Sequence, residues 1–167
     1  LAEYIKTAGQ WKYEQLEFAE KKEYYLLSSA QKRLHFLQQM DRDSIAYNIP
    51  SGMILEGIVD KTLLLQGMLK LIRRHESFRT FFVMVNNEPV QRINENVEFE
   101  IEHYISSTDY TDDRDDKVHH SSFIIHQFNF VRPFDLSKAP LIRVGLVELA
   151  EKRHLFMVDM HHIIADG

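Results

Sequence analysis

A short polar run near the end of the chain combines residue types that can carry out acid–base chemistry. His161 and His162 are adjacent, and Asp166 follows four residues after the second histidine, directly before Gly167. An imidazole titrates near neutral pH, a carboxylate can fix local geometry, and glycine permits backbone turns that other residues disfavour. The run therefore combines an imidazole that can transfer protons with a carboxylate and a glycine that can fix the local backbone. A histidine pair taken alone is, however, more often structural than catalytic.

Metal binding is the second chemistry that paired histidines suggest. Consecutive strand residues point to opposite faces, so His161 and His162 cannot easily share one ion. The histidines between residues 119 and 126 do not share a helical face, and the acidic cluster at 109–116 lacks the alternate-residue ligand ladder of a calcium loop. With 6 glycines, the chain also shows no phosphate-binding loop. We therefore expect no metal and no directly bound cofactor.

The residues before the polar run predict the elements that must position it. Leu155–Met160 is mostly apolar and indicates a buried strand, which places the histidines where a strand ends and a loop can open a site. Ser28 or Ser29 is expected to cap one helix, and Asp60 another. Periodicity predicts helices at 29–40, 61–75 and 117–130, strands at 49–57 and 98–104, a loop at 106–116, and hairpins at 78–93 and 141–160. The expected fold class is α+β, a mixed α/β sandwich.

Four ordered segments carry a specific family resemblance. In one-letter code they follow SxAQxR at residues 28–33, RHExLRTxF at 74–82, FDLSxAPLxR at 134–143 and HHxxxDG at 161–167. Over residues 24–167 they resemble the motifs of condensation domains in nonribosomal peptide synthetases. Phe78 replaces the usual leucine, and Ala165 is one of the residues common at its position, so neither departure removes a functional group.

The resemblance implies both a fold and a reaction. The fold is a chloramphenicol acetyltransferase-like lobe, one half of a two-lobe domain with a tunnel between the lobes. The reaction is amide formation between two substrates held as thioesters on the phosphopantetheine arms of carrier proteins. The catalytic positions fall on His162, at the centre of the tunnel, and on its neighbour His161. Two roles stay open for His162: a general base for the attacking amine, or a group that positions the amine or the tetrahedral intermediate.

Two arginines are expected to support the aspartate of the last motif. Asp166 lies too close to the chemistry to remain unpaired if it is buried, and an arginine can hold a carboxylate through two hydrogen bonds. The resemblance implies that this aspartate is structural. We therefore expect Asp166 to pair with Arg74, or alternatively with Arg79, and Gly167 to provide the turn.

The first 23 residues differ in composition from the rest of the chain. Residues 1–5 are similar to the last helix of a carrier domain, and residues 6–23, rich in Lys, Glu and Gln, are similar to the linker after it. An amphipathic helix on the domain itself is an equal alternative. The expected domains are an upstream carrier end with its linker at 1–23 and the N-terminal lobe of a condensation domain at 24–167. The implied partners are upstream and downstream carrier domains and adjoining synthetase domains, including the second lobe.

Composition excludes several classes of function. The net charge of -5, with interspersed basic residues, leaves no basic face for nucleic acid. The absence of cysteine excludes disulfides and thiolate catalysis. No apolar run approaches the roughly 18 residues that span a bilayer, so we expect no membrane partner and a cytoplasmic location. A chain of 167 residues that is 44% hydrophobic can bury one core.

Three alternative functions fit part of the pattern. An epimerisation domain shares HHxxxDG but usually lacks the SxAQxR segment that residues 28–33 preserve. A freestanding acyltransferase of the same superfamily would fit the histidine motif but not the segment at 74–82. A non-catalytic module that binds carriers is the third alternative. By itself the lobe is expected to be inactive, because half of the tunnel is missing.

Overall fold

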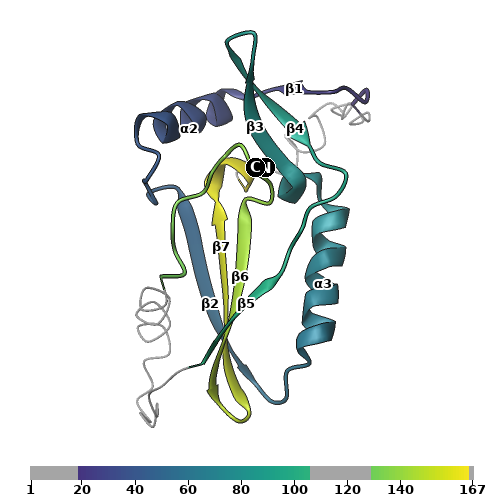
Figure 1. The fold of residues 1–167 in the computed structure, drawn as a ribbon, viewed down its shortest axis with the longest axis vertical. Coiled ribbons are helices and arrows are strands. Elements are labelled where there is room, and N and C mark those ends of the chain that lie inside the picture. The colour runs from purple at the N-terminus through teal and green to yellow at the C-terminus, as the bar shows by residue number, and fades with distance from the viewer. Residues whose placement is uncertain (1–18, 106–128, 166–167) are drawn as a thin grey trace, which may run out of the picture.

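The fold combines helices with two β-sheets and belongs to the α+β class that the sequence predicts (Figure 1). The computed structural model of this chain describes residues 19–105 and 129–165. The strands are β1 Tyr25–Leu26, β2 Asn48–Glu56, β3 Thr80–Val85, β4 Glu88–Ile93, β5 Ile101–Ile105, β6 Ile142–Ala150 and β7 Arg153–His161. The helices are α2 Ser29–Met40 and α3 Lys61–Arg74, with the 3₁₀ helices η1 Glu76–Arg79 and η2 His162–Ile164.

The larger sheet contains four strands in the order β2-β7-β6-β5. β6 and β7 form the expected hairpin, and β2 pairs with β7 in antiparallel register from Asn48 opposite His161 to Glu56 opposite Arg153. β5 pairs with β6 in parallel. The sequence predicts antiparallel hairpins, and β5 differs from that pattern because the long connection from 106 to 141 allows the chain to cross over and return in the same direction.

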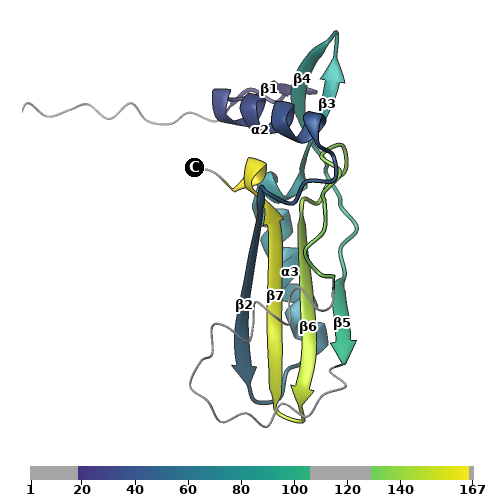
Figure 2. The same cartoon turned by 90° about the vertical axis from the view of Figure 1, so that its left-hand side faces the viewer.

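Helix α3 covers one face of this sheet (Figures 1 and 2). The Asp60 side chain accepts hydrogen bonds from the first backbone N–H groups of α3, as predicted for its N-cap. From α3, Leu64 and Met68 pack against the buried Val144 and Leu146 of β6. Each fully buried aliphatic side chain contributes about 1.5–3 kcal/mol. No helix within residues 19–105 and 129–165 is both long and apolar enough to span a membrane.

A glycine in β6 allows close packing on the opposite face of the sheet. Phe130 is fully buried there, in a cluster that includes Leu155 and Met157. A Cβ atom at Gly145 would lie 2.7 Å from Met157 Cε and 2.9 Å from Phe130 Cε2, which is closer than carbon atoms approach without displacement. Gly145 thereby lets Phe130 pack directly on the sheet, shortly before the FDLSxAPLxR segment, whose last two residues enter β6.

The smaller sheet has the order β1-β4-β3 and lies, with α2, beyond the end of the larger sheet at which β7 finishes (Figure 2). β3 and β4 form the predicted hairpin. Asn86 and Asn87 at its tip have φ values of 51° and 64°, as a type I′ turn requires. The hairpin presents β3 toward α2 and η2, where the motif segments meet.

Helix α2 begins as the sequence predicts, with Ser28 rather than Ser29 as its N-cap. The Gln31 N–H donates to the Ser28 hydroxyl at 3.2 Å, and the Ser28 N–H donates to Gln31 Oε1 at 3.0 Å. This reciprocal arrangement is a capping box, and it fixes where the helix starts. The sequence pattern places Leu34 and Leu37 on the buried side of this helix, and the structure confirms it: Leu34 is buried and Leu37 is half-buried.

Several sequence predictions lie outside the described residues. They are the carrier-like segment and linker up to residue 18, the loop at 106–116 with its acidic cluster, and residues 117–128 of the predicted third helix with their histidines. The last two residues of that predicted helix are described and are not helical. Asn129 has a φ of 50°, which places it in a turn.

Candidate active site

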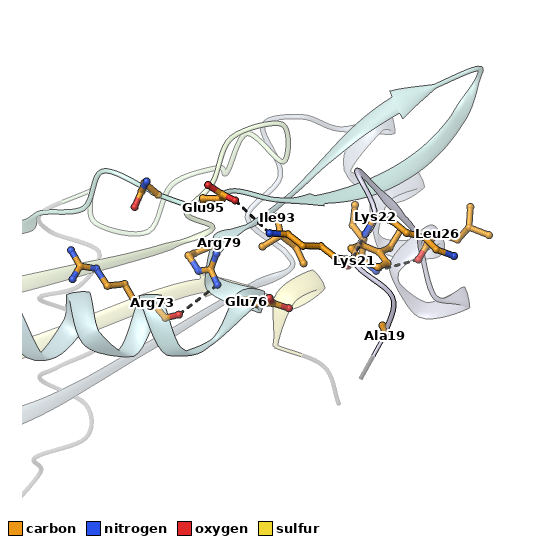
Figure 3. A pocket seen from close by; sticks show the side chains of 12 residues that line it. Ala19, Lys21, Lys22, Leu26, Arg73, Glu76, Arg79, Ile93 and Glu95 are labelled. Carbon is orange, nitrogen blue, oxygen red and sulfur yellow. Dashed lines mark hydrogen bonds and ion pairs between the residues drawn. The ribbon is translucent and has the colours of Figure 1, made fainter. Parts of the chain in front are cut away.

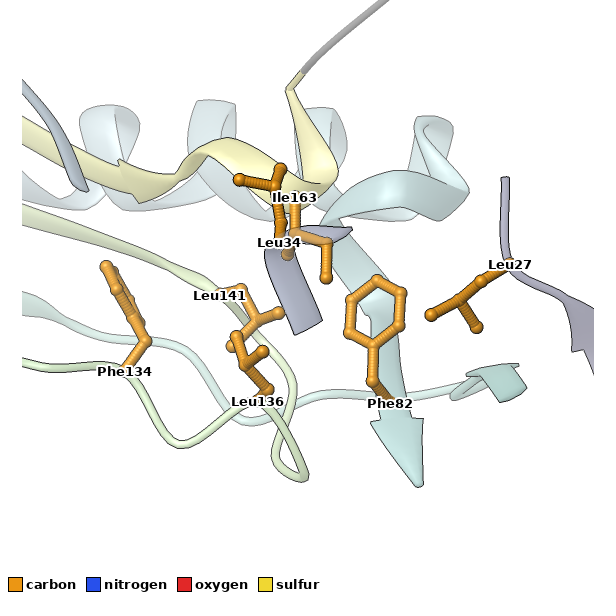
Figure 4. Close-up of a cluster of buried hydrophobic side chains, with 7 residues drawn as sticks. All are labelled: Leu27, Leu34, Phe82, Phe134, Leu136, Leu141 and Ile163. Carbon is orange, nitrogen blue, oxygen red and sulfur yellow. The ribbon is translucent and has the colours of Figure 1, made fainter. Parts of the chain in front are cut away.

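Seven buried apolar side chains bring the motif segments together at the end of β7 (Figure 4). They come from the residue before the SxAQxR motif, from α2, from β3, from residues 134–141 and from η2: Leu27, Leu34, Phe82, Phe134, Leu136, Leu141 and Ile163. None is more than 7% exposed. Their burial from water therefore attaches η2 to segments that are far apart in the sequence.

His161, the last residue of β7, is completely buried. The Ile163 N–H donates to its Nδ1 at 3.1 Å, and its Nε2 lies 3.3 Å from Gln38 Oε1. Burial, followed by the neighbouring His162, lowers the pKa of His161 to about 4, so the ring is neutral at pH 7. The Phe134 ring meets it edge-on, with centroids 6.2 Å apart. This environment favours a positioning role for His161 over the catalytic role that the resemblance implies.

His162 opens η2 and has a different environment. Its side chain is half-buried, and its backbone N–H donates to the Tyr47 carbonyl at 2.8 Å. Its ring atom Nδ1 is buried and has no hydrogen-bond partner among the described residues. A buried polar atom is normally paired. His162 is therefore the more accessible of the two rings, and its Nδ1 is left for a partner outside the described residues, whereas both ring nitrogens of His161 have contacts.

Three hydrogen bonds to backbone groups of residues 161–163 hold the turn that carries the two histidines. The His161 N–H donates to the Leu141 carbonyl at 3.0 Å, so the turn is tied to the FDLSxAPLxR segment. The Gln31 side-chain amide donates to the Ile163 carbonyl at 3.4 Å, which ties it to the SxAQxR segment. Together with the contact to Tyr47, these bonds hold the turn against the first and third motif segments.

The sequence did not predict a buried ion pair that includes Asp159, two residues before His161 on β7. Arg143 Nη1 and Asp159 Oδ2 are 3.2 Å apart, with side chains 10% and 0% exposed. Asn48 Nδ2 donates to the same carboxylate oxygen at 2.8 Å. Burial raises the pKa of Asp159 to about 6 and lowers that of Arg143 to about 10. Both groups are therefore charged at pH 7, and each compensates the buried charge of the other.

The Arg143 guanidinium also connects this ion pair to His161. It donates to the carbonyls of Phe130, Arg132 and Pro133, which fixes the path of the chain into the third motif. Its Cζ lies 3.7 Å from the centre of the Phe134 ring, whose edge meets His161. A signal for the pair was present in the sequence: Asp159 is a carboxylate in an otherwise apolar strand, two residues before His161 and on the same strand face.

The two arginines of the RHExLRTxF segment have different environments. Arg74 ends α3 and is exposed. Arg79 is half-buried and donates to the carbonyls of Ile72, Arg73 and Asn94, so it joins the end of α3 to the end of β4. Asp166 and Gly167 lie outside the described residues. The pairing of Asp166 with Arg74 or Arg79 therefore stays a prediction.

Arg79 also borders a cavity of about 1030 Å³ between the segment before α2, η1 and β4 (Figure 3). Its charged lining residues are Lys21, Lys22, Arg73, Glu76, Arg79 and Glu95. Lys21 and Glu95 are paired at 3.6 Å and are both highly exposed, so this pair contributes little to stability. The lining mixes both signs of charge and does not by itself indicate a particular ligand.

Replacing Asp166 by alanine is expected to lower thermal stability as well as activity. If Asp166 pairs with the half-buried Arg79, its removal leaves that guanidinium without its compensating charge, whereas a pair with the exposed Arg74 would contribute only about 0–1 kcal/mol. Asp166→Asn keeps the shape and removes only the charge. Thermal unfolding of both variants should be compared with that of His162→Ala, which is expected to melt close to the wild type. An inactive Asp166→Ala variant with a wild-type melting temperature would assign the aspartate to the chemistry instead.

Comparison with known proteins places these motifs in one family. Residues 21–167 match the family model described as "Condensation domain". The chain is 44% identical over 167 residues to tyrocidine synthase 3 of Brevibacillus parabrevis, and 45% identical over 152 residues to surfactin synthase subunit 2 of Bacillus subtilis (strain 168). These matches cover 100% and 91% of this chain but only 2% and 4% of the relatives. The chain thus corresponds to a small part of very long proteins.

Solved structures share the fold at lower sequence identity. The starter condensation domain of rhizomide synthetase superimposes with a TM-score of 0.68 at 22% identity, over 85% of this chain and 34% of that one. The first condensation domain of the calcium-dependent antibiotic synthetase gives a TM-score of 0.67 at 19% identity, over 83% and 32%. These likenesses confirm the chloramphenicol acetyltransferase-like fold that the sequence predicts.

Proposed function

This chain belongs to the condensation-domain family, and from this premise we propose that it is the N-terminal lobe of a domain that forms amide bonds. The substrates are aminoacyl or peptidyl groups bound as thioesters to the phosphopantetheine arms of carrier domains. The observation that carries the proposal is the convergence of all four motif segments on η2, which presents His162 beside a buried, neutral His161. No cofactor is needed at the lobe itself, because the carriers deliver both substrates.

The proposed reaction does not require His162 to act as a strong base. The acceptor amine attacks the donor thioester carbonyl, a C–N bond forms, the C–S bond breaks, and the proton lost by the amine is balanced by the proton gained by the departing thiol. An α-amine has a pKa of about 8, so part of it is already neutral at pH 7 and a strong base is not required. Holding the two tethered substrates together can supply about 7–11 kcal/mol of the rate enhancement. We therefore assign His162 mainly to positioning, with partial base character.

The proposed partners follow from the same chemistry. A donor carrier and an acceptor carrier must each present a thioester to His162, and a second lobe must close the tunnel around it. In this proposal residues 1–23 are the end of an upstream carrier domain and its linker, and residues 24–167 are the lobe. The SxAQxR segment supports condensation over epimerisation, because epimerisation domains usually lack this segment; here its Gln31 caps α2 and contacts η2.

The complete protein is expected to form an amide from loaded donor and acceptor carriers, whereas the isolated 167-residue chain is expected to form none above background. The reason is that this lobe supplies His162 but only one wall of the proposed tunnel. Mass spectrometry of the acceptor carrier measures the product in both cases. Turnover by the isolated chain would refute the two-lobe proposal. Carrier binding without product in the complete protein would support a non-catalytic module.

A further inference from the structure

The side chain of Gln38 has hydrogen-bond partners that determine which way its amide faces. Gln38 lies in α2 and is 3% exposed. Its Nε2 group donates to the Arg42 carbonyl at 3.2 Å and to the Ser44 carbonyl at 3.3 Å. Reversing the amide would place its oxygen against these two carbonyl oxygens, which cannot donate. The amide oxygen must therefore face His161 Nε2, 3.3 Å away.

The two ring nitrogens of His161 then have fixed and complementary roles. Because Gln38 Oε1 can only accept, His161 Nε2 carries the proton and donates it. Because the Ile163 N–H donates to Nδ1 at 3.1 Å, Nδ1 is the unprotonated nitrogen. Both contacts require the same neutral tautomer. In the other tautomer, or in the imidazolium, an N–H at Nδ1 would face the N–H of Ile163, and the contact that begins η2 would be lost.

We propose that Gln38 is a positioning residue that selects the Nε2–H tautomer of His161 and thereby holds the turn that presents His162. Gln38 acts through the His161 ring and touches neither substrate nor the reacting atoms. The effect on the turn depends only on the hydrogen bonds that join Gln38, His161 and Ile163, whereas the effect on turnover rests on the proposed function. Burial of the imidazole, which lowers its pKa to about 4, is consistent with a ring that stays neutral.

A purely structural role for Gln38 is the competing explanation, because the same side chain anchors the connection after α2 through Arg42 and Ser44. Two variants separate the roles. Gln38→Met removes all three hydrogen bonds, while Gln38→Glu loses the donors to the two carbonyls and keeps an oxygen that can accept from His161. Gln39→Met is the matched control, since Gln39 is the exposed neighbour in α2 and contacts only the Arg42 guanidinium in the described residues.

The test is amide hydrogen exchange of the peptide that contains Ile163, measured by mass spectrometry at pH 8 in the complete protein, together with kcat and KM for condensation. Gln38→Met is expected to speed exchange at Ile163 by about tenfold and to lower kcat about tenfold, with KM for both loaded carriers unchanged, as for the loss of one buried hydrogen bond. Gln38→Glu and Gln39→Met should keep the wild-type protection of Ile163.

A double-mutant cycle shows whether Gln38 acts through His161. In His161→Asn, the asparagine oxygen can accept the Ile163 N–H without help from Gln38, so adding Gln38→Met should change neither exchange nor kcat further. An effect of equal size in both backgrounds, or loss of Ile163 protection in Gln38→Glu, would overturn the proposal in favour of the structural role. Unchanged exchange in Gln38→Met would also overturn it. Expected exchange behaviour without condensation by the wild type would refute the proposed function alone.

Discussion

In the complete protein, His162→Ala is expected to reduce amide formation by two orders of magnitude or more while both carriers remain loadable. General base catalysis contributes about 10²–10⁴-fold, and a single hydrogen bond to a tetrahedral intermediate contributes about 10²–10³-fold. The substitution removes the half-buried imidazole ring of His162 at the start of η2, which is the group that we expect to act on the substrates. Single-turnover assays with preloaded carriers, followed by mass spectrometry, measure the effect.

The control for this variant is His103→Ala, because His103 is an exposed histidine on β5 of the same sheet. His103→Ala is expected to leave turnover unchanged. His162→Asn distinguishes the two roles of His162, since asparagine can still donate a hydrogen bond but cannot act as a base near pH 7. Substantial activity in His162→Asn would favour positioning. Near-normal condensation by His162→Ala would exclude a chemical role for this residue.

Asp159→Ala is expected to destabilise the lobe by about 3–5 kcal/mol, because it leaves the Arg143 guanidinium buried without its carboxylate. Glu95→Ala is the matched control: it breaks the exposed pair with Lys21 and should cost under about 1 kcal/mol. Pulse proteolysis across a urea series measures the stability of this region in the complete protein, when fragments from residues 129–165 are followed by mass spectrometry.

The double variant Arg143→Met with Asp159→Leu should be more stable than either single variant. It removes both charges, so neither is left without a partner in the buried site. Comparing the unfolding of the double variant with that of each single variant separates the cost of an uncompensated charge from the cost of lost packing around Phe134. If Asp159→Ala unfolds at the same urea concentration as Glu95→Ala, the buried pair does not stabilise the fold and our interpretation of it is wrong.

Local features of the fold were predictable from the sequence because they depend on neighbouring residues. Ser28 and Gln31 form a capping box from residues three positions apart, and the asparagines at 86 and 87 adopt the positive φ values that a tight hairpin needs. The apolar run of β7 predicted a mostly buried strand, and the apolar positions of α3 include Leu64 and Met68, which pack on the sheet, although Leu71 is exposed. The four motifs predicted the family, which the family match confirms, because their order and residue types do not depend on knowing the contacts.

The arrangement around the histidines was decided by tertiary structure. Adjacent histidines are chemically identical in sequence. The ring of Phe134, the amide of Gln38 and the turn at Ile163 make His161 buried and neutral, while one ring nitrogen of His162 has no hydrogen-bond partner within residues 19–105 and 129–165. The parallel pairing of β5 and the pairing of Arg143 with Asp159 likewise depend on where distant segments meet. Sequence patterns encode what each residue can do, but burial and hydrogen-bond partners determine which of those capacities the folded protein uses.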